Sequence, residues 1–301
     1  MRTTRCGAPA RRWTEVAARL KQTLAAGDFV VAPGVFEMFS AKIADRMGFK
    51  ALYMTGYGIS ASHLGLADAG LVTYRDMVER ARTIAEGTSV PLIADADTGF
   101  GGLINVRQTV RGYEAAGVQA IQIEDQEMPK KCGHTPNRRV IAAVDMCRKI
   151  EVAVDARANA DTLIIARTDA RTGLGLDEAI RRGQEYAKAG ADIVFVEAPE
   201  SEDEFKRVGD AVDCWLLANM VPTGKSPVVS AANLTAYGFN IAIYPSAGMS
   251  VVCAALEASY GHLKKNGSTD GSPVPAYTMA QLHELTGFPD VWEFEKRFAE
   301  T

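Results

Sequence analysis

The chain has 301 residues, of which 47% are hydrophobic and 23% charged, the balance of an ordinary globular protein. Its formal charge of -4 gives no electrostatic reason to bind nucleic acid, and no apolar run approaches the ~20 residues that span a bilayer. We therefore expect no nucleic-acid partner and no membrane partner. The five cysteines form no CxxC pair, which argues against a disulfide framework and favours a reducing, cytoplasmic location.

The N-terminus is basic. The first fourteen residues carry Arg2, Arg5, Arg11 and Arg12 and no acidic residue. Such a segment is typical of an organelle transit peptide, or of a leader loosely attached to the fold, and the residues do not decide between these. We assign residues 1–27 to this leader and a first helix.

A repeat follows, in which a helix-like segment ends near a glycine and a short apolar strand begins. Glycine is the usual left-handed cap of a helix, so each repeat reads as helix, turn and strand. Amphipathic segments such as 106–116 and 176–189 supply the helices. The strands are expected within 48–54, 117–123, 190–196 and 238–244, with four further apolar runs at 28–32, 90–94, 162–166 and 215–218.

Alternating strands and helices over about 240 residues predict a (β/α)8 barrel of the TIM type, which we assign to residues 28–264. An open α/β sheet is the alternative, because periodicity cannot show that a sheet closes. The nearest dinucleotide fingerprint, Gly56-Tyr57-Gly58, lacks the third glycine. The barrel is therefore preferred.

In such a barrel the chemistry collects at the carboxyl ends of the strands. Asp95 and Asp97 follow one predicted strand and Glu124 the next, so three acids are expected to converge. Converging acids repel each other unless a cation compensates, and oxygen ligands suit Mg²⁺ or Mn²⁺. The alternative is that arginine and lysine side chains, or water, neutralise them.

The loop PKKCGHTPNRR, residues 129–139, follows the strand that ends at Glu124. Lys130, Lys131 and His134 flank Cys132, so we expect its thiolate to be favoured and the thiol to exchange protons near neutral pH. The glycine and prolines suit a loop that closes over a ligand. A buried, inert cysteine and a functionless basic loop are the alternatives, and a single Cys-Gly-His pair offers too few ligands for zinc.

The motifs LGLADAG, IADADTGFG, IEDQ, KKCGH, IIARTDAR, FVEA, LLANM and IYPSAG follow one another between about residues 30 and 264. Together they resemble the isocitrate lyase / phosphoenolpyruvate mutase superfamily. The resemblance is strongest to its short lyase branch, which includes methylisocitrate lyase, 2,3-dimethylmalate lyase and carboxyphosphonoenolpyruvate phosphonomutase.

The resemblance implies a metal site and a substrate class. Asp97 would bind Mg²⁺ directly, while Asp68, Asp95 and Glu124 would reach the ion mainly through its waters. The ligand would be a 2-hydroxy or 2-oxo carboxylic acid. The resemblance places its contacts at Thr55, Gly56, Tyr57, Gly133, Glu197, Asn219 and Pro245.

It also implies catalytic roles. Cys132 matches the general acid, Arg167 contacts the bound oxygen, and Tyr53 takes part in removing the hydroxyl proton. Lys130 and His134 complete the catalytic set. Cleaving the bond between C2 and C3 of a 2-hydroxy acid requires loss of the hydroxyl proton, stabilisation of the negative oxygen and a proton for the leaving carbanion, and these residues cover all three needs.

We therefore predict an enzyme, a metal-dependent carbon-carbon lyase that yields pyruvate or another 2-oxo acid. Phosphonate chemistry of the carboxyphosphonoenolpyruvate phosphonomutase kind, and hydrolysis or decarboxylation of oxaloacetate, are the alternatives. The ring of Tyr57, where relatives usually carry a small residue, and Pro222, where many carry Glu, favour a small malate derivative over a tricarboxylate.

Residues 265–301 begin with a polar, Gly/Pro-rich connector, and residues 279–299 read as helical, with apolar residues at amphipathic spacing. The resemblance implies that such C-terminal helices pack on a neighbouring subunit of a homotetramer. The residues alone show only an amphipathic tail.

Overall fold

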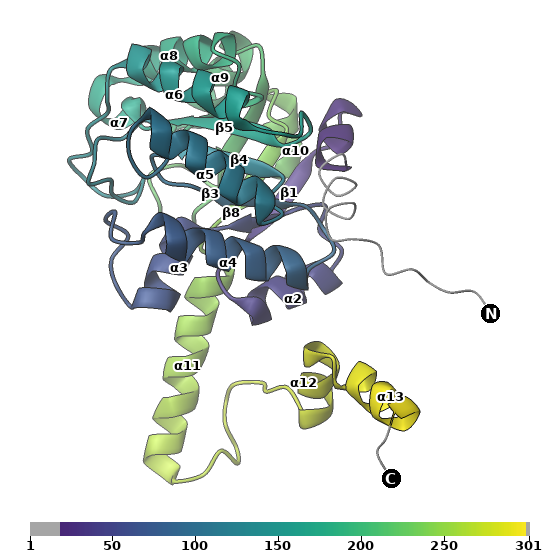
Figure 1. The fold of residues 1–301 in the computed structure, drawn as a ribbon. Helices are drawn as coiled ribbons and strands as arrows, with labels where there is room; N and C mark the ends of the chain where they lie inside the picture. Colours follow the sequence, from purple (N-terminus) through teal and green to yellow (C-terminus); the bar gives the residue numbers. More distant parts are fainter. Residues whose placement is uncertain (1–18, 299–301) are drawn as a thin grey trace. The chain divides into compact units, whose positions relative to one another are not determined.

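The computed structural model describes residues 19–298, so the predicted leader and transit signal lie largely outside the described residues. Within this range eight parallel strands pair in sequence order and close into a barrel, with β1 beside β8 (Figure 1). The predicted (β/α)8 barrel is confirmed, and each predicted apolar run overlaps one of the strands. The strands are β1 (Val30–Val35), β2 (Leu52–Met54), β3 (Leu92–Asp95), β4 (Ala120–Glu124), β5 (Leu163–Thr168), β6 (Ile193–Val196), β7 (Trp215–Asn219) and β8 (Ile241–Tyr244).

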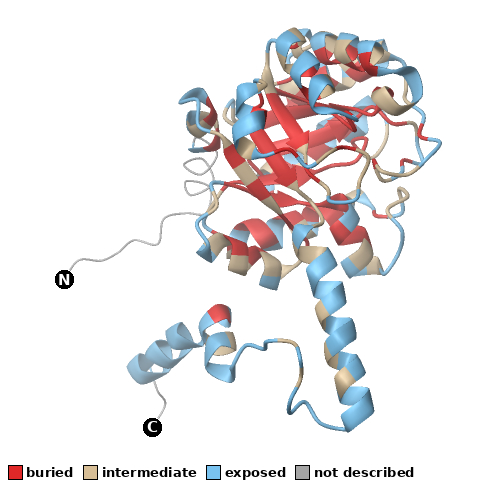
Figure 2. Cartoon of the chain, turned by 180° about the vertical axis from the view of Figure 1, so that it is seen from behind, coloured by how far each residue is buried: buried red, intermediate tan, exposed pale blue. Residues whose placement is uncertain are grey.

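Helices lie between the strands and cover the outside of the barrel. Figure 2 shows the buried strands enclosed by helices whose outer faces are exposed. No helix among residues 19–298 combines the length and apolar character needed to cross a membrane. The helices of this unit are α2 (Met38–Arg46), α3 (Gly56–Ile59), α4 (Tyr74–Gly87), α5 (Leu103–Ala115), α6 (Ala143–Ala156), α7 (Ala170–Leu174), α8 (Leu176–Lys188), α9 (Glu202–Ala211) and α10 (Ala231–Ala236), with a π-helical turn at Ser60–Leu64.

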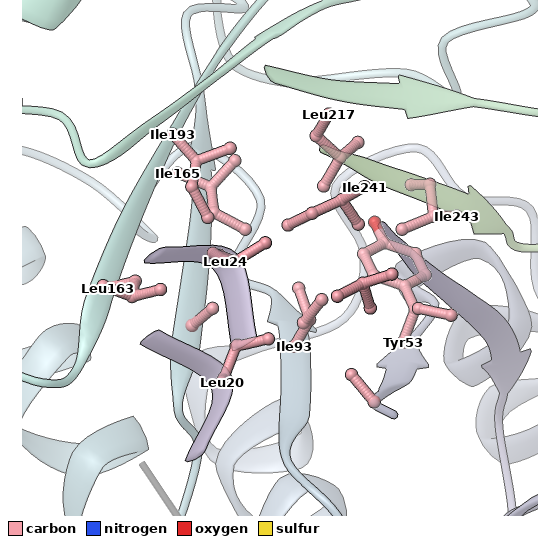
Figure 3. Packing of buried hydrophobic residues seen from close by; sticks show 14 of the residues in the cluster. Leu20, Leu24, Tyr53, Ile93, Leu163, Ile165, Ile193, Leu217, Ile241 and Ile243 are labelled. Atoms are coloured by element: carbon pink, nitrogen blue, oxygen red, sulfur yellow. The ribbon is translucent and has the colours of Figure 1, made fainter. Parts of the chain in front are cut away.

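The interior of the barrel is filled by apolar side chains from alternate positions of the strands. Figure 3 shows Ile93, Ile165, Leu217 and Ile243 in this cluster, together with the ring of Tyr53. Successive side chains of a strand point to opposite faces, so the residue two positions after each cluster member also points inward. The apolar cluster therefore fixes which residue at each strand end faces the barrel mouth.

Residues 248–301 form a second unit, separate from the barrel unit. It holds nearly all of α11 (Ala247–Asn266), which has no buried residue, and α12 (Met279–Thr286) and α13 (Phe288–Phe298). The predicted helical tail is confirmed within the described residues as two helices, because Gly287 ends α12 in the left-handed conformation, with φ of 89°. The predicted domain boundary at residue 264 stays a prediction.

Candidate active site

The mouth of the barrel is lined by polar residues that continue the inward positions of the core. Asp95 lies two residues after Ile93, Arg167 two after Ile165, and Asn219 two after Leu217. The same spacing leads from other cluster members to Gly34, Thr55, Gln122, Glu197 and Pro245. Register adds a further constraint, since Glu124 of β4 pairs with Arg167 of β5 and the two side chains share a face. The predicted strand-end residues are thus brought together.

Four carboxylates gather over β3 and β4 around one ammonium group. Lys130 Nζ lies 2.5 Å from Asp68 Oδ1 and 2.7 Å from Asp97 Oδ1, and all three side chains are at least nine-tenths buried. Asp95 Oδ1 accepts a hydrogen bond of 2.9 Å from the backbone N–H of Asp97. Asp97 has a φ of 49°, a strained conformation for an aspartate that is typical of functional loops. The fourth acid, Glu124, is 1% exposed.

The electrostatics of this cluster favour an additional cation. Burial raises the pKa of Asp97 to about 7, aided by Asp95 and Asp68 and opposed by Lys130. Burial also raises the pKa of Glu124 well above its usual range, and Glu124 Oε1 is buried without a hydrogen-bond partner. These oxygen donors fit Mg²⁺ or Mn²⁺. Among residues 19–298 no three acid, thiol or imidazole side chains converge closely enough to bind an ion directly.

Arg167 is the central cation of the other side of the mouth. Its Nε and Nη2 each donate a 2.9 Å hydrogen bond to the carboxylate of Asp169. Its guanidinium also lies 3.3 Å from Glu124 Oε2 and 3.5 Å from Glu197 Oε2, and stacks over the ring of Phe195. Burial disfavours its charge, but these acids outweigh burial and raise the pKa of Arg167. It is therefore a fixed, permanently charged group that faces the barrel axis.

The loop that carries Cys132 is anchored at its neck. Gln126 and Val140 form an antiparallel bridge across the two ends of the loop. The side chain of Gln126 also holds Lys131, donating to its carbonyl at 2.8 Å and accepting from its N–H at 2.9 Å. Further along, Cys132 N–H donates to the carbonyl of Asp68 at 3.1 Å. The loop thus reaches across to the segment that supplies Asp68.

Gly133 places the loop directly against Arg167. A Cβ atom at this position would lie 2.6 Å from Arg167 Nη2 and 2.9 Å from Glu197 Cδ. Such distances leave no room for any side chain. The loop is therefore seated over the barrel mouth, with Cys132 beside Arg167 and Glu197.

The environment of Cys132 differs from the prediction. Burial raises the pKa of the Cys132 thiol, and the acids Asp68 and Glu197 add to the effect. Lys130 does not serve the thiol, because its ammonium group is bound by Asp68 and Asp97. The expectation of a favoured thiolate is wrong, since neighbours in sequence are not neighbours in space in a folded loop. A protonated thiol is the form that a general acid needs.

Tyr53 lies in the barrel, where its hydroxyl group is 3.2 Å from Gln122 Oε1. Burial, followed by the charge of Asp95, raises its pKa well above its usual range. The phenol is therefore neutral and donates hydrogen bonds near neutral pH. The predicted role of Tyr53 in removing the hydroxyl proton stays a prediction. To act in this way, its phenol would need more positive charge nearby to lower its pKa.

A second cluster of polar side chains, which includes Asn219 and His134, lies close to Arg167. Asn219 Nδ2 donates to Glu197 Oε2 at 3.1 Å, and Lys225 N–H lies 3.5 Å from His134 Nδ1. Asn219 Oδ1 and His134 Nε2 are buried without hydrogen-bond partners. Burial lowers the pKa of His134, so it is a neutral imidazole that can donate or accept. These atoms are available to a bound molecule.

The remaining predicted contacts surround the second strand end. Thr55 Oγ1 caps α3 by accepting from Gly58 N–H at 3.3 Å, and the first N–H groups of a helix have no partner within it. A Cβ at Gly56 would lie 2.5 Å from Asp95 Oδ2, so glycine is needed here. Tyr57 is 44% exposed and does not fill the barrel. Pro245 follows β8, and its carbonyl oxygen would be 2.3 Å from a Cβ at Gly34.

Replacing Gly133 with alanine tests the seating of the loop. The added methyl group would overlap Arg167 and Glu197, so we expect turnover to fall about tenfold or more, as overpacking of this kind costs about 1–3 kcal/mol. The melting temperature should change little, because the loop can lift away. Gly173→Ala in α7 is the control, since its Cβ would meet only Arg138 O at 3.8 Å. Equal activity of both variants would contradict the seated loop.

Sequence reasoning did not assign three residues that the structure places in this network. Arg138 pairs with Asp169, Gln122 binds Tyr53, and Gln126 holds the loop. Gln122 could have been found, because it lies two residues after Ala120 of the inward cluster. For Arg138 no signal distinguishes it from Arg139 in the sequence.

The fold and the site define a class of protein: a (β/α)8 barrel enzyme whose acid-rich mouth is closed by a cysteine-bearing loop. The family model described as phosphoenolpyruvate phosphomutase matches residues 20–264, and the chain belongs to this family.

Two relatives of this chain are named lyases. The 2,3-dimethylmalate lyase of Eubacterium barkeri is 48% identical over 94% of this chain and 98% of its own length. The 2-methylisocitrate lyase of Aeropyrum pernix is 42% identical over 93% and 89%. The predicted superfamily and the predicted enzyme class, a carbon-carbon lyase, are confirmed.

Solved structures that resemble this chain agree with these sequence matches. A 2,3-dimethylmalate lyase matches with a TM-score of 0.88 and 37% identity, covering 94% of this chain and 95% of that chain. An oxaloacetate acetylhydrolase in complex with 3,3-difluorooxalacetate matches with a TM-score of 0.89 and 34% identity, covering 94% and 97%. A phosphonopyruvate hydrolase in complex with oxalate and Mg²⁺ matches with a TM-score of 0.85 and 30% identity, covering 94% and 99%.

Proposed function

We propose that the protein cleaves a 2-hydroxy di- or tricarboxylic acid of the 2,3-dimethylmalate or methylisocitrate type, and that it requires Mg²⁺. The products would be pyruvate or another 2-oxo acid and a second carboxylic acid. The observation that carries this proposal is the seating of Gly133 against Arg167 and Glu197, which holds the Cys132 thiol over a mouth lined with acids. The name of the relative from Eubacterium barkeri supports a small malate derivative.

The residues suit each requirement of the reaction. The C2–C3 bond breaks and its electron pair goes to C3, while the hydroxyl proton passes to solvent water and C2 becomes a carbonyl carbon. The protonated Cys132 thiol gives its proton to C3 and is reprotonated from solvent. Arg167, bound to Asp169 and permanently charged, stabilises negative charge on the oxygen at C2. The neutral phenol of Tyr53 would donate a hydrogen bond near the same oxygen.

A divalent cation would be held by Asp97 directly and by Asp68, Asp95 and Glu124 through water. Mg²⁺ fits best, with Mn²⁺ as the alternative. When bound, it supplies positive charge to the carboxylate and C2 oxygen of the substrate. The raised pKa of Asp97 and the unpartnered Glu124 Oε1 support this assignment.

The remaining groups bind and orient the substrate. The N–H groups of Gly56 and Tyr57, with the hydroxyl of Thr55, would hold the carboxylate beside C2. His134, Glu197 and Asn219 would bind the second carboxylic acid, which suits the unpartnered atoms of His134 and Asn219. Gly133 and Pro245 shape the cavity wall.

A panel of substrates tests the proposal. The purified protein is incubated with Mg²⁺ and dimethylmalate, methylisocitrate, isocitrate, citramalate or oxaloacetate, and release or loss of 2-oxo acid is followed. Release that EDTA abolishes supports a metal-dependent lyase and names its substrate. Loss of oxaloacetate alone would favour the hydrolase or decarboxylase alternative. Silence across the panel would favour phosphonate chemistry, with phosphonopyruvate tested next.

Tyr57 offers a test of substrate size. If its ring narrows the entrance, Tyr57→Gly should raise the rate with methylisocitrate relative to dimethylmalate by about tenfold, the discrimination that one or two methylene groups produce in a pocket. Tyr57→Phe keeps the ring and should behave as the parent. An unchanged ratio of kcat/KM values in Tyr57→Gly would show that Tyr57 does not set specificity.

We also propose a homotetramer in the cytoplasm. The apolar side chains of α11 support an oligomer, since Val251, Leu256 and Tyr260 are between 44% and 66% exposed in the single chain. Light scattering measures the number of subunits directly.

A further inference from the structure

Asp169, at the end of β5, is shared by two arginines from different parts of the chain. Arg167 binds it through two hydrogen bonds of 2.9 Å. Arg138 donates to the same Oδ1 atom from the loop that carries Cys132. Together they outweigh burial and lower the pKa of Asp169, so this carboxylate is ionised. One acid therefore joins the loop to the arginine of the barrel.

Arg138 is directed inward, unlike its neighbour in the loop. Its side chain is 1% exposed, whereas the side chain of Arg139 is 79% exposed and pairs with Glu127. The second nitrogen of Arg138, Nη2, donates to Thr172 Oγ1 at 2.6 Å. Burying a guanidinium is costly unless it is paired, so this placement depends on Asp169 and Thr172, which bind Nη1 and Nη2 while Nε has no hydrogen-bond partner.

Asp169 is also held by contacts that do not involve the Cys132 loop. Its N–H donates to Asp125 Oδ1 at 2.8 Å. Asp125 is itself bound by Arg182 at 3.0 Å and by the hydroxyl of Tyr186 at 2.7 Å. Asp169 is therefore a rigid anchor, and the loop is the partner that can move.

The two limbs of the loop are held differently. The limb before Gly133 is held by the bonds of Gln126 to Lys131 and of Lys130 to the acids. On the limb after it, Arg139 O accepts a 2.9 Å hydrogen bond from Glu127 N–H at the neck, while nearer to Gly133 the contact between His134 and Lys225 is long, at 3.5 Å. Arg138 provides a buried ion pair on this second limb.

We propose that Arg138 is a positioning residue that latches the Cys132 loop onto Asp169, so that closure of the loop and orientation of Arg167 occur together. When the loop closes, the guanidinium of Arg138 is inserted beside the carboxylate of Asp169, which already orients the guanidinium of Arg167. The kinetic consequence rests on the proposed lyase function, but the latch itself can be measured without substrate.

Alkylation of Cys132 by iodoacetamide reports the opening of the loop. The modified fraction of each cysteine is followed over time by peptide mass spectrometry in the full-length protein. In Arg138→Gln, Asp169 stays paired with Arg167 and the barrel stays intact, so we expect Cys132 to react about tenfold faster, the effect of losing a hydrogen bond to a charged group. Loss of a positive charge by itself would slow alkylation, so acceleration reports exposure.

Two controls separate a latch from general loosening. Cys214, which precedes β7 at the opposite end of the barrel and is partly buried, should react at the parental rate in every variant. Arg139→Gln removes the adjacent, exposed arginine and should leave Cys132 unchanged. If Arg138→Gln accelerated Cys132 and Cys214 equally, or accelerated neither, the latch would be overturned.

Milder variants guard against misfolding of Arg138→Gln. Thr172→Val keeps the charge of Arg138 and removes one of its hydrogen bonds. Arg138→Lys keeps a positive charge but has a single donor group. The rate of Cys132 alkylation in both variants should therefore lie between the rates of the parent and of Arg138→Gln. Parental rates in both would also overturn the latch. Once a substrate is known, Arg138→Gln should raise KM and lower kcat, because fewer molecules are closed, and Arg138→Lys should recover part of both. Absence of lyase activity would leave the alkylation result standing and would refute only the proposed function.

Discussion

Cys132→Ser is expected to lower kcat about 10²- to 10⁴-fold, the usual contribution of a positioned general acid. A serine hydroxyl is a much weaker acid than a thiol and cannot give up its proton to the carbanion as readily. KM should change little, because Gly133 and the loop backbone still seat against Arg167 and Glu197. Steady-state release of 2-oxo acid measures both parameters.

The pH profile adds a second expectation for this residue. The active form of Cys132 is the protonated thiol, and burial raises its pKa above its ordinary value. Activity that depends on this proton is therefore fully present at neutral pH and is lost only as the pH rises through the raised pKa, on the alkaline side. Cys147→Ser, in α6 on the outside of the barrel, is the matched control and should keep parental activity. Full activity of Cys132→Ser would remove Cys132 from the mechanism.

Metal binding should depend on pH through Asp97. Its pKa of about 7 in the metal-free protein is raised by burial above that of an unfolded chain. A raised carboxyl pKa means that the folded state binds the proton more tightly, so this contribution to stability is present at low pH and is lost as the pH rises towards 7. A cation requires the ionised carboxylate, and its binding replaces the lost contribution.

We therefore expect Mg²⁺ to raise the melting temperature of the protein more at pH 8 than at pH 6. At a Mg²⁺ concentration one hundred times its Kd the gain corresponds to about 2.7 kcal/mol. Thermal unfolding with Mg²⁺, and with EDTA in its place, measures the difference. In Asp97→Asn, Mg²⁺ should no longer raise the melting temperature at either pH. The melting temperature of this variant in EDTA should also depend less on pH than that of the parent. A gain that persists in Asp97→Asn would place the ion elsewhere.

Much of the site could be predicted from the sequence because of one geometric rule. Alternation along a strand fixes the direction of each side chain, so the residue two positions after an inward apolar residue also faces inward. Asp95, Arg167, Glu197 and Asn219 follow this rule, and the pairing of Glu124 with Arg167 follows from strand register. Short apolar runs separated by helices similarly determined the barrel, since parallel strands need helical connections and cover on both faces.

The loop could not be predicted in the same way, because an irregular backbone has no period that sets side-chain direction. Lys130 lies beside Cys132 in order along the chain, yet its ammonium group reaches Asp68 and Asp97 instead of the thiol. Arg138 and Arg139 are identical and adjacent, yet one is buried against Asp169 and the other is exposed. These placements arise from contacts between segments far apart in sequence.

The sequence by itself thus determined the alternation of strands and helices, the strand-end residues and the superfamily, because strand periodicity and motif order are local properties. The tertiary structure decided the charge state of Cys132, the partners of Lys130 and the burial of Arg138. Burial and electrostatic pairing depend on which segments meet in space, and only the fold brings these segments together.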